Sequence, residues 1–199
     1  MLDFGCGSGR VLPWVASFVP GGSCSGVDVD AEAIAWAAGR FPDLHWAVCG
    51  FEPPLQFDEA SFDIVYSISV FSHLDAEDQE RWLEEIARVL RPEGVALLSV
   101  HGPFAFEQFR TGAVSSGWTE PDAFDRDPLG SAEFAFVPYV RSRWNAADLP
   151  GVGSDYGLAF HGHEYLRERW AQWFSVAAIR ERALAGWQDL VVCNAAGGA

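Results

Sequence analysis

Hydrophobic positions follow two alternating periods along the first half of the chain. Short apolar runs, typical of buried strands, alternate with segments in which apolar residues recur every three or four positions, which is typical of amphipathic helices. This pattern predicts strands over residues 1–4, 24–29, 44–49, 62–68 and 95–100, separated by helices over 10–19, 31–40 and 76–90. The alternation indicates an α/β fold, a doubly wound and mostly parallel sheet with helices on both faces.

Local residues support the limits of these helices. Asp30 and Asp75 stand immediately before the second and third helices, where an aspartate side chain accepts hydrogen bonds from free backbone N–H groups. Pro13 is compatible with the first turn of the first helix. Residues 91–94 (RPEG) are the predicted break between the third helix and the fifth strand. In the third helix, the apolar stripe that includes Trp82 is predicted to face the core.

Residues 103–160 interrupt this rhythm. The segment holds 11 of the 28 aromatic residues and many Pro, Gly, Ser and Asp residues, so it is not one long helix. Two interpretations stay open: a lid or pocket wall, or a satellite core beneath a long loop. A helix near 163–173 follows, and strands over 174–182 and 189–193 should pair antiparallel because few residues separate them. We expect residues 1–199 to form a single domain.

Composition and charge narrow the possible partners. The chain is 49% hydrophobic and can bury a core, and it carries 13 basic and 28 acidic residues, for a net charge of −15. It lacks the basic footprint that a nucleic-acid partner requires. We expect a cytoplasmic protein with no membrane partner, because no apolar run is long enough to span a bilayer and no signal peptide is apparent. No metal site is predicted, because the spacing of the cysteines matches no zinc motif. The four cysteines are Cys6, Cys24, Cys49 and Cys193.

A glycine-rich turn is the clearest chemical feature. Gly5, Gly7 and Gly9 lie where the first predicted strand meets the first helix. Glycines there allow a tight turn and a close approach of the backbone to a ligand. Asp28 ends the second predicted strand nineteen residues after Gly9. A carboxylate at that position can accept both hydroxyls of a ribose.

Two cofactor classes use such a turn. In the nicotinamide fingerprint the third small residue would fall on Arg10, whose large side chain would obstruct packing of the helix on the strand. In the other pattern an acidic residue stands two positions before GxGxG, as Asp3 does before Gly5. Residues 3–9 therefore resemble motif I of the class I S-adenosylmethionine-dependent methyltransferases.

The resemblance covers residues 1–102 and 163–195. Residues 26–30 resemble the family's second strand and residues 61–67 its fourth strand. Residues 86–94 resemble the helix and turn that follow, residues 98–102 the fifth strand and residues 188–192 the seventh strand. The resemblance implies a Rossmann-like seven-stranded sheet with an antiparallel last strand and S-adenosylmethionine as cofactor. Residues 53–82 also resemble bacterial methyltransferases that accompany glycosyltransferases.

The resemblance also implies a set of cofactor-binding residues. The glycine turn would line the methionine part of the cofactor, Asp28 would bind ribose, Val29 would pack beside adenine, and Ser67 and Ile68 would flank the sulfonium. Phe51 stands where the family often has an aspartate, and it either stacks on adenine or only packs. The predicted set is Asp3, Gly5, Cys6, Gly7, Gly9, Asp28, Val29, Phe51, Ser67 and Ile68.

Two histidines are the candidates for catalysis. Methyl transfer from a sulfonium depends mainly on positioning the acceptor, and a base is needed when the acceptor is a hydroxyl. His73 follows the fourth strand and His101 ends the fifth, both on the side where open α/β sheets bind ligands. A structural turn residue and a hydrogen-bonded strand-end residue are the respective alternatives. His161 and His163 are expected to cap the helix that follows them.

The sequence bounds the acceptor only in part. No NPPY sequence follows the fourth strand and no Pro-Cys nucleophile is present, which leaves a small molecule and favours O-methylation of a hydroxyl. A non-catalytic nucleoside-binding domain and an NAD(P)-dependent oxidoreductase are the alternatives, and the absence of Lys disfavours the second. Met1 lies inside the first predicted strand, so we expect the family's N-terminal cap to be missing. The chain would then be a fragment, a sequence with a misplaced start or a minimal variant of the family.

Overall fold

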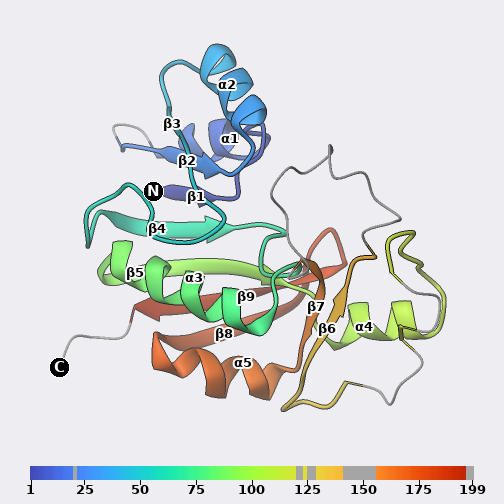
Figure 1. The fold of residues 1–199 in the computed structure, drawn as a ribbon. Coiled ribbons are helices and arrows are strands. Elements are labelled where there is room, and N and C mark those ends of the chain that lie inside the picture. Colours follow the sequence, from blue (N-terminus) through green and yellow to red (C-terminus); the bar gives the residue numbers. More distant parts are fainter. Residues whose placement is uncertain (20–21, 120–122, 125–128, 141–155, 196–199) are drawn as a thin grey trace.

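The computed structural model describes residues 1–19, 22–119, 123–124, 129–140 and 156–195 (Figure 1). Seven strands form one sheet in the order β3-β2-β1-β4-β5-β9-β8. Its first five strands pair in parallel, whereas β9 is antiparallel to both β5 and β8. The strands are β1 (Leu2–Phe4), β2 (Ser25–Asp28), β3 (His45–Val48), β4 (Phe62–Ser67), β5 (Leu90–Val100), β8 (Phe174–Leu184) and β9 (Gln188–Ala195). This arrangement confirms the predicted fold class.

Helices cover both faces of the sheet. The helices of this part are α1 (Leu12–Ala16), α2 (Ala31–Arg40), α3 (Ala76–Val89) and α5 (His163–Arg169). Side chains of α3 and α5 join Val65 of β4 in the larger core, whereas side chains of α1 join the neighbouring Tyr66 in a separate core. Because successive side chains of a strand point to opposite faces, these two cores lie on opposite sides of the sheet. Among the described residues, no helix has the length and apolar character needed to cross a membrane.

Two of the predicted caps are present. The Asp30 carboxylate accepts hydrogen bonds from the backbone N–H groups of Glu32 and Ala33, and α2 begins and ends at the predicted residues. The Asp75 carboxylate accepts one from the N–H of Asp78 at the start of α3. Each carboxylate satisfies backbone donors that the first turn of a helix leaves free.

Other element limits differ from the prediction. The first helix covers only Leu12–Ala16, and the Ser17 hydroxyl donates to the carbonyl of Trp14 where the helix ends. The predicted break at 91–94 instead lies within β5, because Leu90 already pairs with Phe62 and the extra residues form a bulge. The predicted helix 163–173 is α5 followed by the short 3-10 helix η2 (Trp170–Gln172).

The inserted segment contains regular structure and a core of its own. It holds α4 (Pro103–Arg110), β6 (Phe134–Pro138) and β7 (Gly157–His161), and β6 and β7 form a two-stranded antiparallel sheet. Side chains of these elements pack into a third apolar cluster that includes Phe106 and Phe160. The satellite core is therefore present. Residues 141–155 of the insertion lie outside the described part.

Candidate functional site

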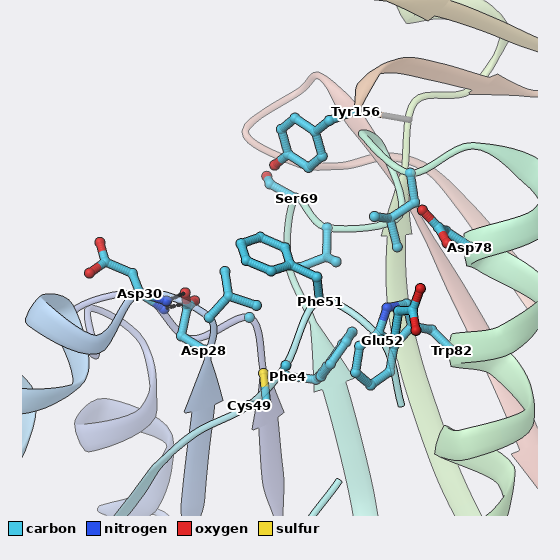
Figure 2. Close-up of a pocket in the computed structure, with 16 residues that line it drawn as sticks. Phe4, Asp28, Asp30, Cys49, Phe51, Glu52, Ser69, Asp78, Trp82 and Tyr156 are labelled. Carbon is cyan, nitrogen blue, oxygen red and sulfur yellow. Dashed lines mark hydrogen bonds between the residues drawn. The ribbon is translucent and has the colours of Figure 1, made fainter. Parts of the chain in front are cut away.

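A cavity of about 440 Å³ lies where β1, β2 and β3 end and where the chain leaves β4 (Figure 2). Openings at the carboxyl ends of parallel strands are the usual ligand sites of open α/β sheets. Its wall combines the glycine turn, aromatic rings and carboxylates. The lining residues are Phe4, Gly5, Gly7, Asp28, Val29, Asp30, Cys49, Gly50, Phe51, Glu52, Ser69, Val70, Leu74, Asp78, Trp82 and Tyr156. Five of the ten predicted cofactor-binding residues are among them: Gly5, Gly7, Asp28, Val29 and Phe51.

The glycine turn requires glycine for different reasons at different positions. Gly5 and Gly9 have φ of +76° and +75°, and a Cβ there would lie 2.2 Å from Val70 Cγ2 and 2.5 Å from the Trp46 ring, respectively. Gly7 has φ of +52°, but a Cβ there would meet nothing within 4 Å. Gly7 therefore leaves open space beside the cavity, whereas Gly5 and Gly9 allow close packing.

The substitution Gly5→Ala should destabilise the protein more than Gly7→Ala. Both replacements place an alanine in left-handed backbone, which costs about 1–2 kcal/mol, but only Gly5→Ala adds a steric conflict with Val70 worth a further 1–3 kcal/mol or so. Urea unfolding followed by tryptophan fluorescence measures the difference. Equal losses of stability in the two variants would contradict the assignment of different roles.

Asp28 is oriented by the backbone around it. Its Oδ2 accepts a hydrogen bond from the N–H of Gly7 at 2.7 Å, and its Oδ1 accepts one from the N–H of Asp30 at 2.9 Å. A carboxylate has further lone pairs on both oxygens, so it can accept additional hydroxyl donors from a ligand. Phe51 is 44% exposed on the cavity wall. Asp28 is thus held in place at the cavity with acceptor capacity to spare.

Asp3, Cys6 and Gly9 do not line the cavity, although the first two are buried next to it. The Tyr66 hydroxyl donates to Asp3 Oδ2 at 2.8 Å across the β1–β4 pair. Burial raises the pKa of the Asp3 carboxyl to about 7, although the hydrogen bond from Tyr66 lowers it. Burial also raises the pKa of the Cys6 thiol well above its usual range. The Asp3 side chain therefore links β1 to β4 through Tyr66 and does not line the cavity.

The cavity residues that follow β4 lie two positions later than predicted. Ser67 is fully buried and Ile68 packs in the core on the α1 side, and neither lines the cavity, whereas Ser69 and Val70 do. Ser69 has φ of +61°, a left-handed conformation, and its N–H donates to Ser99 Oγ at 2.8 Å. This turn after β4, which strand periodicity does not indicate, brings Ser69 to the wall.

Neither candidate catalytic histidine reaches the cavity wall. The Nδ1 of His73 donates to the carbonyl of Gly157 at 2.9 Å, and the hydroxyl of Tyr139 lies 3.1 Å from the same nitrogen. His101 is 4% exposed and stacks on Phe160, with ring centroids 5.4 Å apart. Burial lowers the pKa of both rings, that of His101 to about 3. Both histidines lie where the main sheet meets the β6–β7 unit, which favours their structural roles over that of a base in contact with the acceptor.

Several lining residues were not predicted as site residues. Asp30 was expected only as a helix cap and Trp82 only as a core residue, and both also border the cavity. Glu52 and Asp78 add two carboxylates, which lie 3.8 Å and 3.2 Å from the Arg81 guanidinium, and none of the described wall residues is Arg or His. Tyr156 comes from the inserted segment. The high aromatic content of that segment is the only feature of the sequence that indicates a contribution to the site. The wall is consequently acidic and aromatic.

Comparison with known proteins identifies the family. Residues 2–98 match the model of the methyltransferase domain family. A protein of Mycolicibacterium smegmatis named "Probable S-adenosylmethionine-dependent methyltransferase" is 32% identical over 80% of this chain and 57% of its own length. A demethylmenaquinone methyltransferase of Chlorobaculum tepidum is 31% identical over 49% of this chain and 39% of its own length. The chain thus spans between about two fifths and three fifths of these relatives.

Solved structures agree on the fold. The PH0226 protein of Pyrococcus horikoshii superposes with a TM-score of 0.68 at 18% identity, covering 98% of this chain and 81% of that one. A methyltransferase structure from Methanosarcina mazei gives a TM-score of 0.62 at 19% identity, covering 99% and 92%. Together with the glycine turn, the acidic end of β2 and the sheet order, these similarities lead to one conclusion. Residues 2–98 belong to the methyltransferase domain family, and the chain as a whole has the fold of S-adenosylmethionine-dependent methyltransferases.

Proposed function

We propose that this protein transfers a methyl group from S-adenosylmethionine to a hydroxyl of a small-molecule acceptor. S-adenosylhomocysteine is the leaving group, and the hydroxyl proton passes to water or to a carboxylate of the cavity wall. The observation that carries the proposal is the oriented Asp28 carboxylate beside the open space at Gly7 in one cavity at the strand ends. When bound, S-adenosylmethionine supplies a methyl group already activated on a sulfonium. The residues of the chain then have to bind, orient and exclude water.

The residues present fit this cofactor. Asp28 would accept the ribose hydroxyls through its free lone pairs, and Val29 and Phe51 border the same part of the wall, where an adenine ring would pack. Gly7 leaves room for the methionine part. An acidic wall also favours a cofactor that carries a positive sulfonium and an ammonium group. The net charge of −15 disfavours a nucleic-acid acceptor and supports a small molecule.

Calorimetric titration with S-adenosylhomocysteine, with NADH as the control ligand, tests the cofactor class. We expect binding of S-adenosylhomocysteine with a dissociation constant of about 1–100 μM, or −8 to −5 kcal/mol, and no heat from NADH. S-adenosylhomocysteine leaves out the methyl group and therefore reports binding without turnover. Binding of NADH alone, or of neither compound, would overturn the proposal.

A further inference from the structure

The cavity contains two hydroxyl groups that the proposed cofactor contacts do not use. Ser69 and Tyr156 both line it, and Figure 2 shows the Tyr156 hydroxyl directed toward the Ser69 side chain. Ser69 follows β4 of the main sheet, whereas Tyr156 immediately precedes β7 of the inserted unit. The main sheet and the insertion thus each contribute one hydroxyl to the cavity wall.

Tyr156 is held by its surroundings but leaves its hydroxyl available. Its ring stacks on His73 with centroids 5.3 Å apart and meets Tyr139 edge-on at 5.8 Å. Its carbonyl accepts a hydrogen bond from the N–H of Tyr139, and its backbone forms a bridge with Leu74. Within the described part of the chain, the Tyr156 hydroxyl has no hydrogen-bond partner. Burial raises the pKa of this phenol to about 12, so at neutral pH it can both donate and accept a hydrogen bond.

His73 holds the backbone next to Tyr156 in place through two hydrogen bonds. Its Nδ1 donates to the carbonyl of Gly157, and the N–H of Gly157 donates back to the carbonyl of His73, both at 2.9 Å. This reciprocal pair fixes the residue that follows Tyr156, while the imidazole supports the face of the phenol ring. His73 is therefore suited to position Tyr156 and not to touch a substrate.

Gln188 holds the Ser69 side chain in place, as His73 holds Tyr156. The Nε2 of Gln188 lies 3.0 Å and its Oε1 3.2 Å from Ser69 Oγ, and the residue itself is buried at the start of β9. The left-handed backbone of Ser69 is further held by its hydrogen bond to Ser99. Gln188 and Ser99 thus hold Ser69 in place, and neither of them lines the cavity.

The remaining wall limits the chemical class of an acceptor. Val70, Leu74 and the ring of Trp82 supply an apolar surface. The charged groups among the described wall residues are carboxylates, two of which, Glu52 and Asp78, lie beside Arg81. Among the described residues, no basic side chain pairs with the other two carboxylates, Asp28 and Asp30, and these disfavour an anionic acceptor. A neutral molecule with a hydroxyl and an apolar face matches both the hydroxyl pair and the apolar surface.

We propose that Ser69 and Tyr156 bind the hydroxyl of a neutral acceptor, and that Gln188 and His73 position them. The inference rests on the proposed function and adds the acceptor class and the residues that contact it. Neither contact residue is among those assigned to the ribose or the adenine.

Fragments of nearly equal size provide the test. We would measure binding of benzyl alcohol, toluene and benzoate to the protein saturated with S-adenosylhomocysteine, by ligand-observed NMR. Benzyl alcohol should bind at least about tenfold more tightly than benzoate, and more tightly than toluene. Tyr156→Phe and Gln188→Leu should reduce the preference for benzyl alcohol over toluene at least about fivefold. A merely structural defect would weaken both fragments alike and leave this preference unchanged.

The matched control is Tyr165→Phe, which removes a phenol hydroxyl from α5, where the ring stacks on Phe134 outside the cavity. It should leave the fragment preference as in the wild type, and affinity for S-adenosylhomocysteine should stay within about twofold in all three variants. An unchanged preference in Tyr156→Phe, tighter binding of benzoate, or no binding of benzyl alcohol would overturn the inference. Failure of S-adenosylhomocysteine to bind the wild type would instead overturn the proposed function, and the fragment preferences would then be measured without it.

Discussion

Replacement of Asp28 by alanine is expected to lower the affinity for S-adenosylhomocysteine at least about 100-fold, because hydrogen bonds to a charged group contribute about 1.5–3 kcal/mol each and the ribose offers two hydroxyls. The change also removes the acceptor for the N–H groups of Gly7 and Asp30, which orient the glycine turn. Calorimetry on the purified variant measures the loss. Circular dichroism should show a folded protein, because Asp28 is half-buried and both N–H groups lie near the open cavity.

The matched control for this prediction is Asp58→Ala, which removes the same charge from an exposed loop outside the cavity. Asp58 uses only its backbone carbonyl to accept a hydrogen bond from the Ser61 hydroxyl, and alanine retains that carbonyl. Affinity for S-adenosylhomocysteine should be unchanged in this variant. An Asp28→Ala protein that binds within threefold or so of the wild type would refute the ribose assignment.

The features that the sequence predicts correctly depend on neighbouring residues. Asp30 caps α2 through N–H groups two and three positions away, so the signal is contained in a few residues. The glycine turn and Asp28 are equally local, since each is tied to the end of one strand. Sheet order and the antiparallel β8–β9 pair follow from the same strand and helix alternation combined with the family resemblance.

The site residues that the sequence misplaces depend on contacts between distant segments. The residue at the wall after β4 is set by the left-handed turn at Ser69, whose hydrogen-bond partners Ser99 and Gln188 lie 30 and 119 positions away. His73 is occupied by Gly157, 84 positions along the chain, and therefore faces the insertion. No spacing rule predicts such pairings, because they arise only when the insertion packs on the main sheet.

Acid should destabilise the protein through the buried histidines that lie where the main sheet meets the β6–β7 unit. Burial lowers the pKa of His101 and of His161 from 6.5 to about 3. The ring of His161 donates from Nε2 to Gln79 Oε1 at 2.9 Å, because Gln79 Nε2 already donates to two carbonyls. In the described structure, Nδ1 of His101 and of His161 lacks a well-formed hydrogen bond. The backbone carbonyls of Ala159 and His101 therefore offset only part of the cost of a buried proton on the two rings.

The direction in which stability changes with pH follows from proton linkage. Below pH 6.5 the unfolded chain binds protons that the folded His101 and His161 exclude until about pH 3, so each costs about 1.4 kcal/mol of stability per pH unit in that window. Asp3 acts in the opposite direction, because its folded pKa of about 7 exceeds the unfolded value of 3.8 and its protonation stabilises the folded state as the pH falls. The two effects together predict a net loss of about 1–2 kcal/mol between pH 6.5 and pH 5.

Two variants separate these opposing contributions. His161→Gln removes one titrating ring and can still donate to Gln79, so the loss between pH 6.5 and pH 5 should shrink to near zero. Asp3→Asn keeps an oxygen that accepts from Tyr66 but cannot be protonated, so the loss should grow to about 3 kcal/mol. Urea unfolding at the two pH values measures both, with the exposed His45→Gln as the control that removes a surface imidazole. Shifts of the same sign in His161→Gln and Asp3→Asn would show that these buried groups do not control the acid response.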